Sequence, residues 1–307
     1  MNNIQMLLEE LYHKYLPCME GKLADYIPEL AKVDPRKFAI SITTLNGETF
    51  KVGDVDFKFS LQSVSKPFTY GLVLEEYHRD FVLSKVGVEP TGEAFNSIIE
   101  LEKQTHRPYN PMINSGAIAI TSFINGATEQ ERLARILKLF ENYFGHPVEI
   151  DHDVFLSEKI TAHRNRAIAH LLRHFNIIET DIDESLDLYF KQCSILSDCT
   201  DLSMMGAALA NRGINPKTNK IALKSEFVPD LLSLMFTCGM YDSSGEWAYS
   251  VGIPAKSGVS GAILGVIPGK MGIGVYSPLI DERGHSIRGM KVFKELSEKL
   301  SLNIFKV

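Results

Sequence analysis

The chain has 307 residues, of which 45% are hydrophobic and 23% are charged, and its formal net charge is -6. This composition is typical of a globular protein with enough apolar residues to bury a core, so it excludes an intrinsically disordered chain. The charge comes without a basic run that could follow a phosphate backbone. We therefore expect a small-molecule substrate and no nucleic-acid partner.

The amino-terminal segment has the pattern of an amphipathic helix, which Pro17 and Pro28 interrupt. Its acidic residues come too early for a secretory signal, and no stretch reaches the ~20 apolar residues of a membrane span. These features predict a cytoplasmic protein without a membrane partner. The four cysteines lack C-x-x-C spacing, which favours free thiols in a reducing compartment.

Residues 37–60 alternate between apolar and polar side chains on both sides of Asn46-Gly47, which predicts two strands joined by a two-residue turn. From Ser63 to about residue 211 the pattern is helical. Helices are expected near residues 113–125, 129–143, 154–174, 183–192 and 200–212. A second hairpin is expected at Pro268-Gly269, and an amphipathic helix at 285–301.

This order of elements predicts an α+β fold, in which an antiparallel sheet from both chain ends is flanked by helices and carries an inserted all-helical subdomain. We expect a single catalytic unit over residues 1–307. Residues 1–62 and 218–307 would form its α/β subdomain, and residues 63–217 its helical subdomain.

The first chemical motif is S-x-x-K, formed by Ser63 and Lys66 in "SLQSVSKPFTYG". With 24 serines and 21 lysines in the chain, about 1.6 such matches are expected by chance, so the motif alone is not specific. Its position is informative, because Pro67 and the apolar periodicity after it predict that a helix starts here. A desolvated lysine on the same helix face can activate a serine hydroxyl. Ser60 and Ser65 are competing candidates.

The second motif is Lys256-Ser257-Gly258, at the entrance to the last predicted hairpin. Only about 0.2 K-[ST]-G triplets are expected by chance in a chain of this composition. The backbone N–H of Val259 could join that of Ser63 in holding an oxyanion, while Lys256 supplies a positive field. Glycine lets a substrate approach the backbone closely.

With these motifs the chain resembles the serine β-lactamase and penicillin-binding superfamily, and more closely its cytoplasmic relatives, the serine-dependent glutaminases in their short bacterial form. The resemblance covers nearly the whole chain. Its markers are "QSVSKPF", "NPMINSGAI", "SEKITAHRNRAIA", "YFKQCS", "GMYDSSGEWAY" and "PAKSGVSG". It implies a β-lactamase/transpeptidase-like fold, hydrolysis of the L-glutamine side-chain amide to L-glutamate and ammonia, no metal or organic cofactor, and a homotetramer.

The resemblance also implies residue roles. Ser63 is the acylated nucleophile, Lys66 is its general base, and Tyr241 relays a proton beside them. The backbones of Ser63 and Val259 form the oxyanion hole, near Lys256. The substrate contacts that it implies are Tyr26, Ser63, Asn114, Glu158, Asn165, Tyr189, Tyr241 and Val259.

A glutamine substrate requires pocket groups of the kind that the resemblance implies, because a buried pocket must pair the ammonium and the carboxylate of glutamine. Glu158 can meet the ammonium, and Asn114 and the tyrosine hydroxyls can donate to the carboxylate. Asn165 follows Glu158 by seven residues on the same predicted helix and so returns within about 20° of its face. Without the resemblance, Glu158 beside Lys159 would read as part of a solvated helix face.

Two other functions share parts of this pattern. An exported β-lactamase or D-Ala-D-Ala peptidase has both lysine motifs, but it would need a signal peptide and has no evident use for Glu158. A catalytically silent glutamine sensor would not need Ser63, Lys66 and Tyr241. A metal site at His170 and His174 is disfavoured for want of a third ligand, and Cys193 is expected to be a small buried residue that lines the site.

Overall fold

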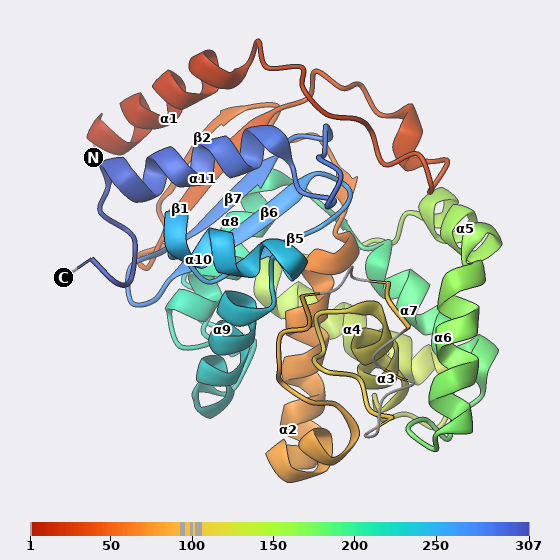
Figure 1. Cartoon of the computed structure of the whole chain (residues 1–307). Helices are drawn as coiled ribbons and strands as arrows, with labels where there is room; N and C mark the ends of the chain where they lie inside the picture. Colours follow the sequence, from red (N-terminus) through yellow and green to blue (C-terminus); the bar gives the residue numbers. More distant parts are fainter. Residues whose placement is uncertain (1, 93–95, 99–100, 102–105, 307) are drawn as a thin grey trace.

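The computed structural model describes residues 2–92, 96–98, 101 and 106–306 (Figure 1). Its central sheet has five strands in the order β2-β1-β7-β6-β5, and all neighbouring strands are antiparallel. The strands are β1 (Ala39–Thr44), β2 (Thr49–Gly53), β5 (Ala255–Ser257), β6 (Ala262–Ile267) and β7 (Met271–Tyr276). The predicted α+β fold, with an antiparallel sheet from both chain ends, is confirmed.

Helices flank this sheet and form most of the segment between its two halves. They are α1 (Asn2–Tyr15), α2 (Lys66–Lys85), α3 (Asn114–Ser122), α4 (Glu129–Phe144), α5 (His152–Thr161), α6 (His163–His174), α7 (Ile182–Cys193), α8 (Cys199–Ala210), α9 (Val228–Thr237), α10 (Ser244–Ser250) and α11 (Ile287–Lys299). Helices α9 and α10 were not predicted from the sequence. Among the described residues, no helix is both long and apolar enough to cross a membrane.

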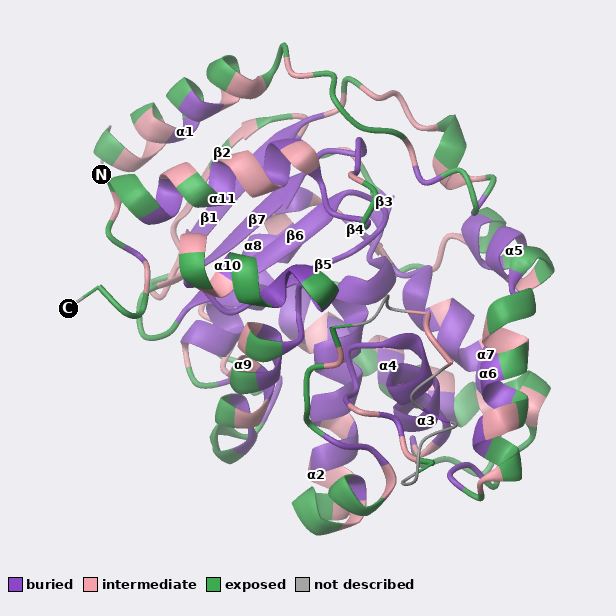
Figure 2. Cartoon of the chain, viewed as in Figure 1, coloured by how far each residue is buried: buried purple, intermediate pink, exposed green. Residues whose placement is uncertain are grey.

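One face of the sheet is covered by α1 and α11, which lie side by side in Figure 1. Successive side chains of a strand point to opposite faces, so Ile40 and Ile42 of β1 share this face with Ile273 and Val275 of β7. They form a buried cluster with Leu8 and Leu11 of α1 and Val292, Phe293 and Leu296 of α11. Figure 2 shows the sheet as buried between its helices.

The opposite face of the sheet packs on α8 at very short range. A Cβ built on Gly272 would lie 2.1 Å from the Ala207 nitrogen, so only glycine permits this approach. The Ser203 hydroxyl of α8 lies 2.8 Å from the hydroxyls of both Ser41 and Thr43 of β1. Helix α8 therefore belongs to the packing of the sheet, although it lies within the long helical part of the sequence.

Both predicted hairpins are present, but the first turn differs from the prediction. Thr43 is the last residue of β1 that pairs with β2, opposite Thr49, so the loop is longer than two residues. Gly47 takes the positive φ of 80° in this loop. The second hairpin pairs Ile267 with Met271 around Gly269, as the sequence indicates.

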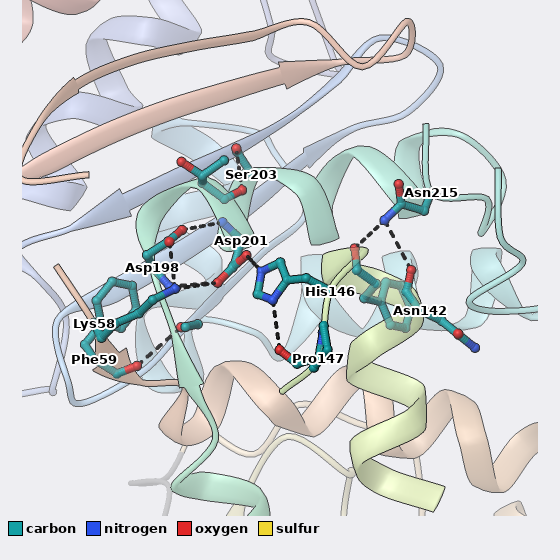
Figure 3. A network of polar contacts seen from close by, with 12 residues as sticks. Lys58, Phe59, Asn142, His146, Pro147, Asp198, Asp201, Ser203 and Asn215 are labelled. Carbon is teal, nitrogen blue, oxygen red and sulfur yellow. Dashed lines mark hydrogen bonds and ion pairs between the residues drawn. The ribbon is translucent and has the colours of Figure 1, made fainter. Parts of the chain in front are cut away.

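A short strand pair leads the chain toward the S-x-x-K motif. Strand β3 (Phe59–Ser60) pairs with β4 (Leu196–Ser197), and a charged network beside it is drawn in Figure 3. Lys58 Nζ lies 2.8 Å from an oxygen of Asp198, which caps α8 by accepting from the Asp201 N–H. His146 Nε2 lies 2.7 Å from Asp201 Oδ1. This network ties the strand before Ser63 to the start of α8.

Candidate active site

A pocket with about 600 Å³ of space, its open mouth included, lies between the helical segment and the end of β5. Its walls come from α3, α5, α6, α7, the turn before α2 and the chain segments around residues 26 and 259. The lining consists of Tyr26, Ile27, Gln62, Ser63, Asn96, Asn114, Glu158, Thr161, Ala162, Arg164, Asn165, Tyr189, Cys193 and Val259. Seven of the ten residues predicted to be catalytic or to contact a substrate therefore line one cavity, and the other three, Lys66, Tyr241 and Lys256, are buried.

Ser63 lies in a 3₁₀ turn, Gln62–Ser65, and α2 begins at Lys66. The serine is therefore in the turn before the helix and not in its first turn. Gln62 has a φ of +50°, an uncommon conformation for a residue other than glycine that often marks functional sites. Ser65 donates to the Gln62 carbonyl at 2.7 Å, and Ser60 accepts from the Gln62 amide at 3.1 Å. Of the three candidate serines, Ser63 is the one that lines the pocket.

Lys66 is almost fully buried, and its ammonium faces neutral acceptors. Nζ donates to Asn114 Oδ1 at 2.8 Å and to the Met112 carbonyl at 3.1 Å. Burial lowers the pKa of Lys66 to about 8, against the smaller opposing effects of Cys193 and Glu158. Desolvation is thus the main reason that this amine can be neutral near physiological pH.

Tyr241 lies between Ser63 and a second buried amine. Burial raises the pKa of its hydroxyl, although the Ser63 side chain opposes the change. Lys256 Nζ lies 3.8 Å from the centre of the Tyr241 ring and Lys66 Nζ lies 5.7 Å from it. Burial, and then the charge of Lys66, hold the pKa of Lys256 well below its usual range.

The end of β5 reaches the Ser63 turn through a glycine. A Cβ built on Gly258 would lie 2.9 Å from the Leu61 carbonyl oxygen and 3.5 Å from the Gln62 Cβ. The Gly258 N–H donates to Ala262, whereas the Val259 N–H has no acceptor among the described residues. A free backbone N–H is therefore available in the wall that contains Ser63.

Glu158 is a buried carboxylate in the same pocket, 6% exposed. Its Oε1 has no hydrogen-bond partner in the described part of the chain. Burial raises its pKa to about 7, while a hydrogen bond with the Gln62 side chain and the charge of Lys66 act in the opposite direction. A buried oxygen without a partner is costly, so this position favours a ligand that donates hydrogen bonds or carries positive charge.

Asn114 connects the buried lysine to the rest of the pocket. Its Oδ1 accepts from Lys66 and, at 3.4 Å, from the Tyr189 hydroxyl. Its Nδ2 donates to Asn165 Oδ1 at 2.9 Å. These side chains come from α2, α3, α6 and α7, so the polar wall exists only when four helices pack together.

The predicted single helix over 154–174 is wrong. Helix α5 ends at Thr161 and α6 begins at His163, because Ala162 has a ψ of 35°. Side chains donate to backbone carbonyls at this break: Thr161 to the Ser157 carbonyl and Arg166 to the Lys159 carbonyl. Glu158 and Asn165 do line one pocket, but they reach it from two helices and not from one helix face.

Tyr26 lies on a strap, residues 22–29, that crosses the pocket. The strap is anchored where the Lys22 N–H donates to Ile280 and the Glu29 N–H donates to Ser157 Oγ. The side chain of Tyr26 is 49% exposed, yet burial and the nearby Glu158 raise the pKa of its hydroxyl well above the usual range. Tyr26 is thus partly exposed and also lines the pocket.

The structure also bears on the possible metal site at His170 and His174 and on the expected place of Cys193 in the pocket. Within the described ranges, no group of three or more His, Cys, Asp or Glu side chains could hold a metal ion, so His170 and His174 have no third ligand there. Cys193 is buried, lines the pocket and has its pKa raised well above the usual range by burial. It is therefore a thiol at neutral pH rather than a nucleophilic thiolate.

Gln62 is the pocket residue that sequence reasoning missed most clearly. It lies directly before Ser63 and bonds to Glu158 through its side chain. The sequence signal that could have indicated Gln62 is its position directly before Ser63 in "QSVSK". Arg164, Asn96 and Thr161 also line the pocket without having been expected.

Comparison with known proteins gives consistent results. The family model described as Glutaminase matches residues 21–305. A glutaminase of Trichormus variabilis is 56% identical over 299 residues, covering 97% of this chain and 89% of its own length. The solved structure of the probable glutaminase ybaS has a TM-score of 0.97 at 42% identity and covers 100% of this chain and 99% of its own. The structure of Mglu in its glutamate form has a TM-score of 0.95 at 40% identity and covers 99% of this chain and 70% of its own.

Proposed function

Since the chain belongs to the glutaminase family, we propose that it hydrolyses the side-chain amide of L-glutamine to L-glutamate and ammonia through an acyl-enzyme on Ser63. The observation that carries this proposal is the Glu158 carboxylate, whose unpartnered Oε1 lies in the same pocket as Ser63. An amino-acid substrate brings an ammonium that such an oxygen needs.

Substrate binding pairs each charge of glutamine with a pocket group. The α-ammonium binds Glu158, and its arrival stabilises the ionised carboxylate, whose pKa is about 7 in the unliganded protein. The α-carboxylate accepts from the side chains of Asn114, Asn165, Tyr189 and Tyr26. This anchoring orients the side-chain amide of the substrate toward Ser63.

In the acylation step, Ser63 Oγ attacks the amide carbon and Lys66 Nζ takes the hydroxyl proton. The pKa of Lys66, about 8, leaves a useful fraction of the amine neutral while keeping it basic enough to accept a proton. The C–O bond forms and the carbonyl oxygen becomes an oxyanion, held by the N–H groups of Ser63 and Val259. The oxyanion then collapses, the C–N bond breaks, and the nitrogen leaves as ammonia with the proton returned through Lys66 and Tyr241.

Deacylation repeats these steps with water as the nucleophile. Lys66 removes a proton from the water, the hydroxide attacks the glutamyl ester, and Ser63 leaves with the returned proton. The buried position of Tyr241, whose pKa burial raises and the Ser63 side chain lowers, supports its role as a neutral hydroxyl that passes this proton.

Ammonia and glutamate release from glutamine tests the proposal, with asparagine and a chromogenic lactam assayed in parallel. We expect release from glutamine in the parent and a loss of at least about 10³-fold in Ser63→Ala. The matched control is Ser84→Ala, an exposed serine near the end of α2, which should keep parental activity. Intact-mass analysis with an electrophilic glutamine analogue should place one label on Ser63. Release that survives Ser63→Ala, or lactam turnover without glutamine turnover, would reject the proposal.

Other expectations stay predictions. The resemblance implies a homotetramer in the cytoplasm, and the order of elements implies a helical subdomain over residues 63–217. Light scattering of the purified chain tests the tetramer, and limited proteolysis at the proposed boundaries tests the subdomain.

A further inference from the structure

His285 lies in the turn before α11 and is fully buried. Its Nδ1 lies 3.0 Å from Ser257 Oγ, and its ring stacks on Tyr241 with ring centres 6.0 Å apart and planes at 20°. One imidazole therefore contacts both the K-S-G strand and Tyr241, whose hydroxyl pKa the Ser63 side chain influences.

The contact with Ser257 holds the end of β5 just before its close approach to the Ser63 turn. The Ser257 side chain is fully buried. Its backbone N–H donates to Gly239, and its carbonyl accepts from Lys256 Nζ at 2.8 Å. Gly258 and Val259 follow directly, so the position of the free Val259 N–H depends on how Ser257 is held.

The turn that carries His285 is itself fixed by hydrogen bonds. The His285 N–H donates to Asp281 Oδ1 at 2.9 Å, and the Asp281 N–H donates to the His285 carbonyl at 2.9 Å. Ser286 Oγ donates to the Ser277 carbonyl at 2.7 Å, which joins the turn to the residue after β7. The imidazole is thus held in place before any substrate binds.

We propose that His285 is a positioning residue for the glutaminase reaction, which acts through Ser257 on the oxyanion-holding N–H of Val259 and through ring stacking on Tyr241. This inference rests on the function proposed above. It concerns the transition state rather than the binding of the α-ammonium and α-carboxylate, because the groups proposed to hold those charges, such as Glu158, Asn114 and Tyr189, are separate from these contacts.

The electrostatic surroundings suit a neutral ring at this position. Burial lowers the pKa of His285 to about 4; Lys256 and Arg283 act in the same direction, and Asp281 and Asp242 oppose them. A neutral imidazole contacts Tyr241 without adding a positive charge that would disfavour protonation of Lys66 or Lys256.

A double-mutant cycle on kcat and KM for glutamine tests the inference. His285→Phe keeps a ring against Tyr241 but loses the bond to Ser257, and Ser257→Ala loses the same bond from the other side. We expect each to lower kcat about tenfold or more and to change KM less than about twofold. The double variant should be no slower than the slower single variant, because both remove one interaction. His285→Asn, which can place a polar atom near the position of Nδ1 but offers Tyr241 no ring, should recover part of the kcat that His285→Phe loses.

Several outcomes would overturn the inference: parental kcat in His285→Phe, losses that add in the double variant, or a rise in KM that matches the fall in kcat. If His285→Phe does not fold, Ser257→Ala tests the inference by itself. Its kcat should fall about tenfold or more while its KM changes less than about twofold, and a parental kcat would overturn the inference. Ser63→Ala is assayed in parallel. Activity in that variant would reject the proposed function, whereas its inactivity with a fully active His285→Phe would reject only the role of His285.

Discussion

Lys66 Nζ donates a 2.8 Å hydrogen bond to Asn114 Oδ1, and Asn114 Nδ2 donates to Asn165. The proposed base and the proposed substrate pocket therefore share one side chain. A neutral amide oxygen accepts from an amine without adding a negative charge that would raise its pKa. This choice of residue type keeps Lys66 close to its deprotonation point.

Replacing this amide by an acid tests that relationship. Asn114→Asp would put a carboxylate beside Lys66, which should raise the pKa of Lys66 by roughly 1–2 units and lower kcat at pH 7 about 10- to 100-fold. Raising the pH should recover much of the lost rate. Asn46→Asp, at an exposed position in the β1–β2 loop, is the control and should leave the pH–rate profile unchanged. A profile in Asn114→Asp that matches the parent would contradict the role of Lys66.

The pH dependence of the parent enzyme follows from two shifted pKa values. Lys66 must be neutral to act as a base, so kcat should rise with pH through an apparent pKa near 8. Glu158 must be ionised to bind an ammonium, so KM should fall as the pH rises through about 7. Steady-state kinetics from pH 6 to pH 9 checks both. A kcat that falls across this range would show that Lys66 is not the base.

Glu158→Gln removes the charge that pairs with the substrate ammonium. We expect KM for glutamine to rise about 30-fold or more, and the dependence of KM on pH near 7 to disappear. Asp153→Asn is the matched control, because it makes the same acid-to-amide change at an exposed position on α5. An unchanged KM in Glu158→Gln would place the ammonium elsewhere in the pocket.

Gly258→Ala tests the close approach of β5 to the Ser63 turn. The new Cβ would lie 2.9 Å from a backbone oxygen, which cannot move away as the end of a flexible side chain would. We expect a loss of about 1–3 kcal/mol in the free energy of unfolding and a fall in kcat that exceeds the change in KM. Gly245→Ala, which has nothing within 4 Å of the new Cβ, should keep parental kcat and stability. Chemical denaturation and steady-state kinetics measure both variants.

Lys66→Met should stabilise the fold while abolishing activity. The pKa of Lys66 falls from 10.5 to about 8 on folding, so below pH 8 the folded state has to keep a buried charge. Removing it should add roughly 1–3 kcal/mol at pH 7, less the cost of leaving Asn114 and Met112 without this donor. Between about pH 8 and pH 10.5 the folded parent binds fewer protons than the unfolded chain, so the free energy of unfolding of the parent rises with pH. The difference in free energy of unfolding between Lys66→Met and the parent should therefore shrink as the pH rises. Urea denaturation at pH 7 and pH 10 measures this trend, and an equal advantage at both would contradict it.

Local patterns predicted much of the architecture. The alternation in residues 37–60 and the helical periodicity after Ser63 led to the correct elements because side-chain burial follows those periods. The break at Ala162 was missed because neither proline nor glycine marks it. At this break the side chains of Thr161 and Arg166 donate to backbone carbonyls, and helix periodicity in the sequence does not reveal such contacts.

The candidate site likewise contains some residues that the sequence predicted and others that only the structure revealed. Ser63, Lys66 and the K-S-G strand could be found in the sequence because they form short motifs whose residue types and spacing indicate their chemistry. Gln62 and His285 could not, since their importance comes from contacts made after folding: Gln62 with Glu158, and His285 with Ser257 and Tyr241.

By itself, the sequence determined the class of fold, the two lysine motifs and the likeness to glutaminases, because these depend on residue type and on spacing along the chain. Only the tertiary structure decided that seven of the predicted side chains line one pocket, that Ser63 precedes α2, and that burial brings the pKa of Lys66 to about 8. The physical reason is that desolvation and hydrogen bonding depend on neighbours in space. Residues such as Lys66 and Asn114, 48 positions apart, become neighbours only when the helices pack.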